Sequence, residues 1–172
     1  MPHDFIEERR RVKRLKKLRV LEEEQIKAKG GKGNVYQYTR TGYRNDLGLL
    51  FRSSWEANFA RVLTIHGIKY EFEPETFWFP IKRGTKGYTP DFYFPATNER
   101  VEIKGYFDDK SRIKLKRYSK YYPEEFSNLY LLISRTSKKS QLECEKLGIE
   151  KIIYYEDFRD AYKPLIPGWE GR

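Results

Sequence analysis

Apolar residues recur along the chain with two different periods, and the change of period marks its structural elements. After Ser54 the large residues Trp55 and Phe59 recur at helical spacing, which predicts an amphipathic helix. Ser53 or Ser54 is a suitable N-cap for this helix, and Gly67 provides its end.

Other segments alternate apolar and polar residues or are almost wholly apolar, as is typical of strands. The predicted strands cover residues 35–39, 69–72, 76–79, 88–94, 100–104, 129–134 and 151–155. Further helices are predicted over residues 110–122, 137–147 and 156–162, with loops over 40–47 and 95–99. The order helix, three or four strands, helix, strand predicts an α/β fold with a mixed sheet flanked by helices.

The N-terminal segment is strongly basic and has only a narrow apolar stripe. Residues 9–19 read RRRVKRLKKLR, and helix-forming residues extend over 5–29 before two glycines supply a stop. Such a helix is either solvated along its charged face or in contact with nucleic acid, and the sequence favours neither interpretation over the other. The candidate contacts are Arg9, Arg10, Arg11, Lys13, Arg14, Lys16 and Lys17. We predict a basic helical arm over residues 1–33 and one domain over residues 34–172 with a C-terminal strand–helix supplement.

The overall charge indicates a polyanionic partner. The 172 residues include 35 Lys and Arg against 25 Asp and Glu, a formal net charge of +10. Lys and Arg release counterions from each phosphate that they neutralise, and Lys114 and Lys116 of the predicted helix 110–122 are further candidate contacts. Charge alone does not separate DNA, RNA and an acidic membrane, but the apolar runs are too short for a membrane span or a signal peptide.

Cysteine and histidine are scarce, and this limits the available chemistry. Cys144 is the only cysteine, so no intrachain disulfide is expected and a reducing, cytoplasmic compartment fits. Together with His3 and His66 it offers no spacing for a structural zinc site. A hydrolytic reaction would therefore depend on carboxylates, lysines and a hard metal ion.

Polar residues on two predicted strands can meet on one face of the sheet. Asp91 points away from the face of Phe92, and Glu102 and Lys104 share the face opposite Ile103. If the two strands form a hairpin, Asp91, Glu102 and Lys104 converge at the sheet rim. Two carboxylates and a backbone carbonyl, such as that of Ile103, suit Mg²⁺, and a lysine beside the ion can orient or help to deprotonate a bound water. From these local residues alone, a solvated strand face is the favoured alternative.

Several other residues are weaker candidates for the same site. Glu56 lies where an acidic residue either complements a helix N-terminus or joins a metal site, and the two interpretations weigh equally. Tyr88 and Tyr93 either frame the site or pack. The glutamates that share one face of a predicted strand are expected to be solvated rather than to assist the metal: Glu71, Glu73 and Glu75.

Four motifs carry a resemblance to a known superfamily. They are FRSSWEANFAR at 51–61, YEFEPE at 70–75, YTPDF at 88–92 and VEIKG at 101–105. In this order they resemble the PD-(D/E)XK nucleases, in particular the small phage and mobile-element members, over about residues 42–134. The resemblance implies a restriction-endonuclease-like αβββαβ core and Mg²⁺-dependent DNA cleavage, with Mn²⁺ expected to substitute.

The resemblance also implies roles for individual residues. Asp91 and Glu102 would be metal ligands, Lys104 the catalytic lysine, and Glu56 the helix carboxylate that completes the site. The hypothesis is thus a phage or mobile-element endodeoxyribonuclease, either of the homing or restriction type or selective for branched DNA. The alternatives are a non-catalytic nucleic-acid-binding module with a nuclease-like fold, which the intact residue set disfavours, and an RNA-binding protein. A homodimer or higher homo-oligomer remains open.

Overall fold

The computed structural model describes residues 41–171. The described residues divide into two compact units, residues 41–61 with Glu170 and Gly171, and residues 62–169. The predicted arm, its seven basic candidates from Arg9 to Lys17, the predicted strand 35–39 and the boundary at residue 33 all lie outside the described residues. No described helix is long and apolar enough to span a membrane.

The first unit is built on a two-stranded hairpin. Strands β1 (Gly42–Arg44) and β2 (Leu49–Phe51) pair antiparallel, so the prediction that residues 40–47 form only a loop is wrong. This short strand escaped the sequence pattern because its inward residue is Arg44, which is buried through a 2.6 Å ion pair with Glu170. Gly48, with φ of +67°, permits the tight turn between the strands.

Helix α2 (Ser54–Ile65) starts in the first unit and matches the helix predicted from Ser53 or Ser54. A buried cation in its second half, Arg61, binds both the β1–β2 turn and Glu170. Arg61 pairs with Asp46 at 2.7 Å and with Glu170 at 2.8 Å. The Asn58 side chain donates to the Glu170 carbonyl at 2.8 Å. Glu170 therefore joins residues that are more than a hundred positions away in the sequence.

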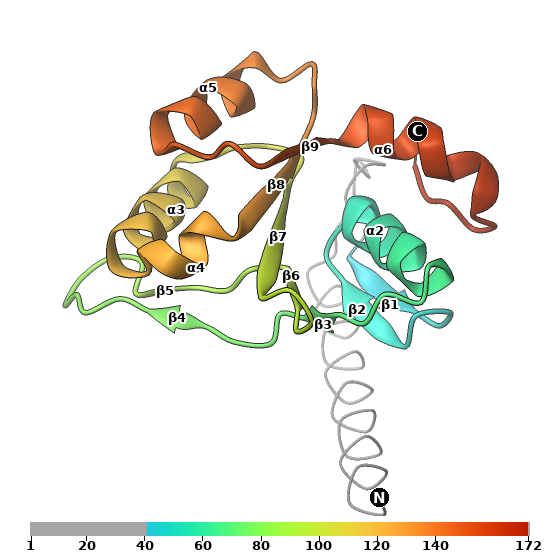
Figure 1. Ribbon diagram of the computed structural model, residues 1–172, viewed down its shortest axis with the longest axis horizontal. Coiled ribbons are helices and arrows are strands. Elements are labelled where there is room, and N and C mark those ends of the chain that lie inside the picture. The colour runs from blue at the N-terminus through green and yellow to red at the C-terminus, as the bar shows by residue number, and fades with distance from the viewer. Residues whose placement is uncertain (1–40, 172) are drawn as a thin grey trace, which may run out of the picture. The chain divides into compact units, whose positions relative to one another are not determined.

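The second unit contains a five-stranded mixed sheet in the order β3-β6-β7-β8-β9 (Figure 1). Strands β3 (Glu71–Phe72), β6 (Phe92–Phe94) and β7 (Glu99–Lys104) pair antiparallel, whereas β8 (Leu129–Ile133) and β9 (Ile152–Tyr154) continue it in parallel. This sheet confirms the predicted mixed α/β architecture. A strand parallel to its neighbour needs a long crossover, and residues 105–128 supply it.

Helices α3 (Asp109–Tyr121), α4 (Pro123–Ser127) and α5 (Lys138–Leu147) gather on one side of β7 and β8, and α6 (Tyr155–Tyr162) lies on the other (Figure 1). A short 3₁₀ turn, η1 (Lys163–Leu165), follows. Short α4 was not predicted, since its only sequence signal is Pro123 at the first turn. The core on the α3 side is largely aromatic and includes Phe77, Tyr88 and Tyr118.

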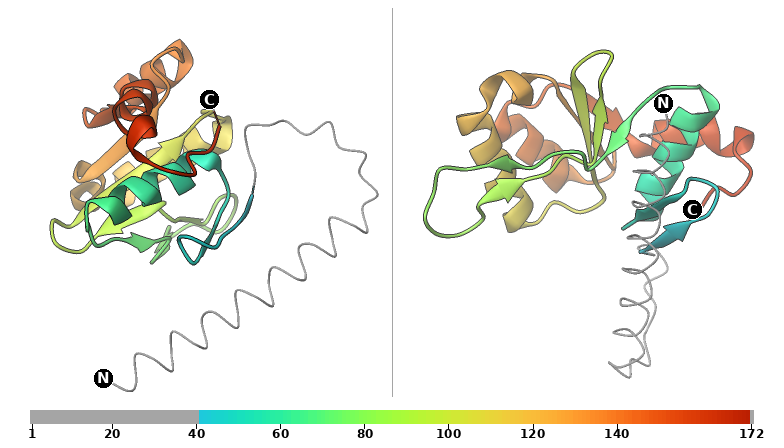
Figure 2. Two further views of the ribbon diagram at one scale, coloured as in Figure 1. Left: turned by 90° about the vertical axis from the view of Figure 1, so that its right-hand side faces the viewer. Right: turned by 90° about the horizontal axis from the view of Figure 1, so that it is seen from below.

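The predicted strand 88–94 is wrong as a single element. The chain forms β5 (Gly87–Tyr88), which pairs with β4 (Phe77–Trp78) in a separate small sheet, and then β6, which joins the main sheet. Pro90 lies between the two strands and cannot donate to a sheet ladder. The β4–β5 hairpin and the β6–β7 hairpin are seen as separate ribbons in the right panel of Figure 2.

Candidate active site

Asp91 lies in the bend between β5 and β6, directly after Pro90. The pairing of β6 with β7 extends no further than Phe92 and Val101. Beyond that point the Asp91 carboxylate takes the place of a neighbouring strand, because its Oδ2 accepts a 2.7 Å hydrogen bond from the Ile103 backbone N–H. The break at Pro90 therefore positions a carboxylate against the end of β7.

Glu102 is almost wholly buried, with 3% of its surface exposed. Its Oε2 accepts a 2.9 Å hydrogen bond from the Tyr88 hydroxyl, and its Oε1 forms an ion pair with Lys104 Nζ. Glu102 and Lys104 share a face of β7, as the alternation of the strand predicts. That face is not the solvated strand face that was the alternative interpretation, because Glu102 is buried there against the core on the α3 side.

The surroundings keep both donors to Glu102 protonated. Burial alone would lower the pKa of Lys104, but the charges of Glu102 and Asp91 outweigh it and raise that pKa above its ordinary value. Burial, followed by the charges of Glu102 and Asp91, raises the pKa of Tyr88 well above its ordinary value. At neutral pH Lys104 is thus an ammonium and Tyr88 a phenol.

The donor set fits a hard divalent cation. Asp91 and Glu102 bring two carboxylates, and Lys104 one ammonium, into a largely buried place. Residues 41–171 contain no group of three or more His, Cys, Asp or Glu side chains able to hold a metal. The protein ligands would be the two carboxylates and the Ile103 carbonyl, with water or substrate oxygens filling the remaining octahedral positions.

Glu56 belongs to the first unit and forms a capping box at the start of α2. Its Oε1 accepts a 2.8 Å hydrogen bond from the Ser53 hydroxyl, and its Oε2 accepts a 2.9 Å bond from the Arg52 backbone N–H. Ser53 Oγ in turn accepts a 3.2 Å bond from the Glu56 N–H. The structure thus shows the helix-terminus role of Glu56, and its catalytic role stays a prediction.

The other sequence candidates lie outside this cluster. Glu75 pairs at 3.0 Å with Arg100, so it neutralises a buried cation rather than a metal ion. The ring of Tyr93 lies against the Arg100 guanidinium, with 4.7 Å between the ring centre and Cζ. Lys114 is half-buried and Lys116 exposed on α3, and their contact with nucleic acid stays a prediction.

Two contributions were missed at the sequence level. Tyr88 was noted only as a residue that frames the site or packs, yet its hydroxyl orients Glu102. Arg100 lies two positions before Glu102 on the same face, buried over the Phe77 ring. The alternation of the strand places Arg100 on the face of Glu102 and was the available signal. Only the fold shows which aromatic rings and which glutamate surround it.

Substitutions at two buried tyrosines distinguish the contribution of a hydroxyl hydrogen bond to stability from that of ring packing. Tyr88→Phe removes a bond to a buried carboxylate and is expected to lower the free energy of unfolding by about 1–3 kcal/mol. Tyr118→Phe removes a buried hydroxyl that has no hydrogen-bond partner among the described residues, so the unfolding free energy should not fall. Urea unfolding of both variants measures this, and equal losses would contradict the assignment of Tyr88.

Comparisons with known proteins identify the family of the chain. The family model described as phage endonuclease I matches residues 36–164, more than half of the chain. Endonuclease I of Escherichia phage T7 is 34% identical over 124 residues, which cover 67% of this chain and 83% of that protein. No solved structure matches. The matched segment contains Asp91, Glu102 and Lys104, and it confirms the resemblance to the PD-(D/E)XK nucleases. The chain therefore belongs to the phage endonuclease I family, and it is an endonuclease that hydrolyses phosphodiester bonds of DNA.

Proposed function

We propose that the chain uses Mg²⁺, held by Asp91, Glu102 and the Ile103 carbonyl, to cleave branched DNA, with Lys104 as the catalytic lysine. The observation that carries this proposal is the cluster at the end of β7, in which two anchored carboxylates lie with one lysine in a largely buried place. A DNA-binding module without catalysis has no need of a buried lysine beside two carboxylates.

Each protein group has a task in the hydrolysis. A bound Mg²⁺ would supply Lewis acidity to the scissile phosphate and lower the pKa of a coordinated water. Lys104, kept protonated by its surroundings, orients the attacking water and stabilises the negative charge that builds on the phosphate oxygens. Tyr88 fixes the orientation of Glu102. The water oxygen bonds to phosphorus and gives up a proton to solvent, the bond to the 3′ oxygen breaks, and that oxygen takes up a proton, leaving a 3′ hydroxyl and a 5′ phosphate.

The fold favours recognition of DNA shape over recognition of a long sequence. Apart from the arm, only the segment after Ser134 could provide a separate sequence-reading element. That segment is built into the second unit instead. Strand β9 is the fifth strand of the sheet, and Cys144 and Ile149 belong to its core. Branched DNA, recognised through its geometry, is therefore the substrate class that we infer.

Removing the charge of Asp91 or Lys104 is expected to slow cleavage by at least about 100-fold, the usual scale for loss of one preorganised charge at a reacting phosphate. Asp91→Asn retains an acceptor for the Ile103 N–H, and Lys104→Met retains the length of the side chain. Asp109→Asn and Lys69→Ala, at exposed positions, are the matched controls. The measurement is nicking of supercoiled plasmid with Mg²⁺, together with calorimetric binding of Mn²⁺, which only Asp91→Asn should weaken. If all variants cleave alike, or none including the wild type cleaves, the assignment fails.

Glu56→Gln separates the capping role of Glu56 from its predicted role in the reaction. The amide oxygen of the variant still accepts from the Arg52 N–H, and the amide NH2 can donate to the Ser53 hydroxyl, so the variant should unfold within about 0.5 kcal/mol of the wild type. A role as a ligand or base needs the charge, and cleavage is therefore expected to slow at unchanged stability. Wild-type cleavage rates in this variant would leave Glu56 as a helix cap alone.

A four-way junction should be cleaved faster than a linear duplex of the same base composition, by at least about 10-fold or 1.4 kcal/mol. The rate on the junction should not depend on the sequence of its arms, because backbone geometry rather than base edges is read. Single-turnover assays on two junctions of unrelated sequence and their matching duplexes measure both points. Equal rates on junction and duplex, or cleavage of one sequence alone, would contradict branch selectivity.

A further inference from the structure

Strand β4 and its flanking residues place one large aromatic ring in solvent. Phe77 and Phe79 point inward and are buried, with 8% and 5% exposed, whereas Trp78 between them is 66% exposed. Period-two alternation explains the direction of the side chain but not the choice of tryptophan at a solvated position. A single exposed ring is ordinary on a protein surface, so the significance of Trp78 depends on the residues around it.

The Trp78 side chain is held in place on the hairpin. Trp78 pairs with Gly87 across the two strands, and a methyl group added to Gly87 would lie only 3.1 Å from Trp78 Cε3. The ring therefore lies close over a residue without a side chain. The Tyr122 hydroxyl donates a 2.6 Å hydrogen bond to the Trp78 carbonyl. The Trp78 backbone is thus anchored and its ring lies close over Gly87, which limits the conformational entropy that the ring can lose when a ligand stacks on it.

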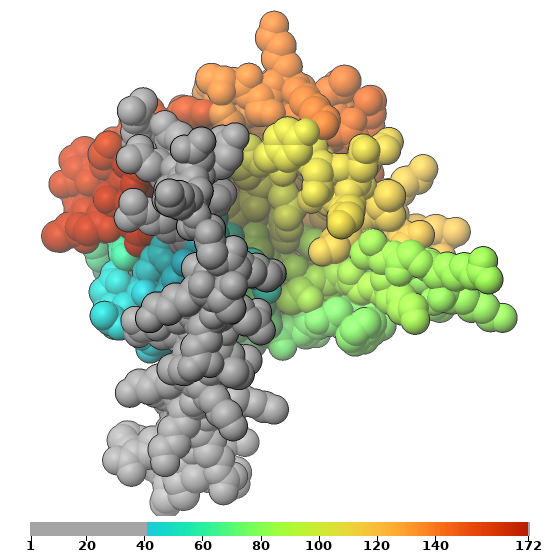
Figure 3. Space-filling model, turned by 180° about the vertical axis from the view of Figure 1, so that it is seen from behind, coloured from blue at the N-terminus to red at the C-terminus, as the bar shows by residue number. Residues whose placement is uncertain are grey.

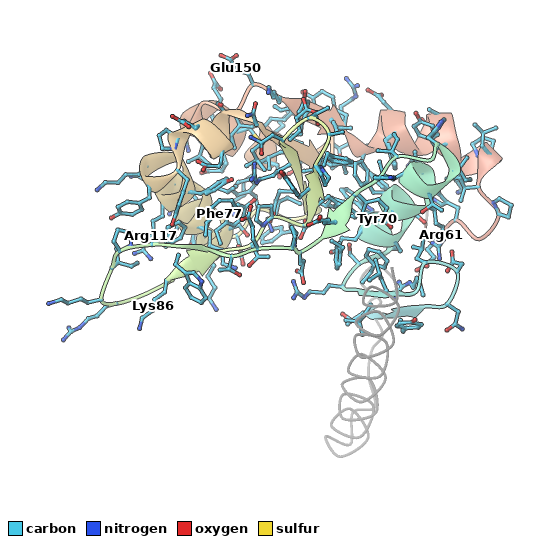
Figure 4. The ribbon with its side chains drawn as sticks, turned by 60° about the horizontal axis from the view of Figure 1, so that its bottom comes forward. Arg61, Tyr70, Phe77, Lys86, Arg117 and Glu150 are labelled. Carbon is cyan, nitrogen blue, oxygen red and sulfur yellow. The ribbon has the colours of Figure 1, made fainter. Side chains whose placement is uncertain are left out.

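The turn of the same hairpin is basic. Residues 76–90 contain three cations and no acidic residue. Lys82, Arg83 and Lys86 are all exposed, and none of them forms an ion pair with a described residue. Arg117 of α3 donates a 2.6 Å hydrogen bond from Nη1 to the Thr85 carbonyl and so holds the turn (Figure 4). In Figure 3 the green hairpin stands out beside the yellow α3.

The hairpin is connected directly to the catalytic cluster. Phe77 of β4 pairs with Tyr88 of β5, and the Tyr88 hydroxyl orients Glu102. A ligand bound along the outer face of the hairpin is thus bound to the same two-stranded unit that positions a catalytic carboxylate. Among possible polyanions, the DNA that this enzyme cleaves is the one that must come to this place.

We propose that the β4–β5 hairpin is a DNA-binding element in which Trp78 stacks on an exposed base face and Lys82, Arg83 and Lys86 bind the flanking phosphates. Combined aromatic stacking and cationic contacts are how proteins hold unpaired strands. Stacking requires a base whose face is not covered by its neighbour, which occurs at branch points, gaps and single strands. The inference rests on the proposed function for its choice of branched DNA.

The test measures binding rather than cleavage, so its failure is separate from failure of the proposed function. The full chain is titrated onto a fluorescein-labelled four-way junction, a gapped duplex and an intact duplex, with Ca²⁺ in place of Mg²⁺. The variants are Trp78→Ala, Trp78→Phe and the triple change Lys82→Gln, Arg83→Gln, Lys86→Gln. The controls are Leu165→Ala, at an exposed apolar position, and a triple change of equal charge, Lys69→Gln, Lys146→Gln, Lys163→Gln.

Trp78→Ala is expected to weaken binding to the junction and the gapped duplex by about 5- to 100-fold, with a much smaller effect on the intact duplex. The triple hairpin variant should flatten the dependence of log Kobs on log salt by about 0.7–0.9 for each phosphate that the hairpin no longer neutralises. DNA should quench tryptophan emission, and Trp78→Phe should abolish that part of the quenching. Both controls should bind as the wild type does.

Three results would overturn the proposal. The first is a change of less than twofold in the dissociation constant of Trp78→Ala for all three DNAs. The second is an emission component of Trp78 that acrylamide cannot quench in the free protein, because another part of the chain then covers the ring. The third is conversion of a dimer to a monomer by Trp78→Ala at unchanged affinity per subunit, because the ring then contacts a second copy.

Discussion

The Glu102 carboxylate is almost wholly buried, and the surrounding elements supply its ion-pair and hydrogen-bond partners. Breaking a buried ion pair by removing one partner costs about 3–5 kcal/mol, because the remaining charge is left uncompensated. Lys104 reaches Glu102 from the same strand face, and Tyr88 reaches it from a different sheet. The small β4–β5 sheet and the main sheet are therefore linked through one carboxylate.

The position of the second carboxylate, Asp91, depends on an interruption of the strand and not on regular strand pairing. A continuous strand through residues 88–94 would give the Ile103 N–H a backbone partner. Pro90 breaks the strand, and Asp91 supplies a side-chain oxygen to the same N–H. The hydrogen bond that stabilises the end of β7 thereby also fixes a carboxylate next to Glu102. One hydrogen bond therefore contributes both to the stability of β7 and to the position of a carboxylate of the site.

The sequence predicted the elements that have a clear period. Helix α2, strands β7 and β8 and helices α3, α5 and α6 lie close to their predicted positions, and alternation correctly placed Glu102 and Lys104 on one face. It could not reveal how deeply that face is buried, because the covering residues Leu115 and Tyr118 come from a helix that follows the motif. The same limit applied to Arg44, whose partner Glu170 lies at the far end of the chain. Long-range ion pairs leave no periodic signal.

The parallel pairing of β7 with β8 has a consequence for the order in which the molecule matures. Glu102 lies beside Leu131 and Lys104 beside Ile133, so the catalytic face is closed only after the whole crossover 105–128 and β8 have left the ribosome. Contacts of such separation form late, since the chain between them must first be ordered. A nascent chain that already carries Asp91, Glu102 and Lys104 thus lacks the buried surroundings that hold them. The active centre is therefore complete only after the part of the chain that follows its motif has folded.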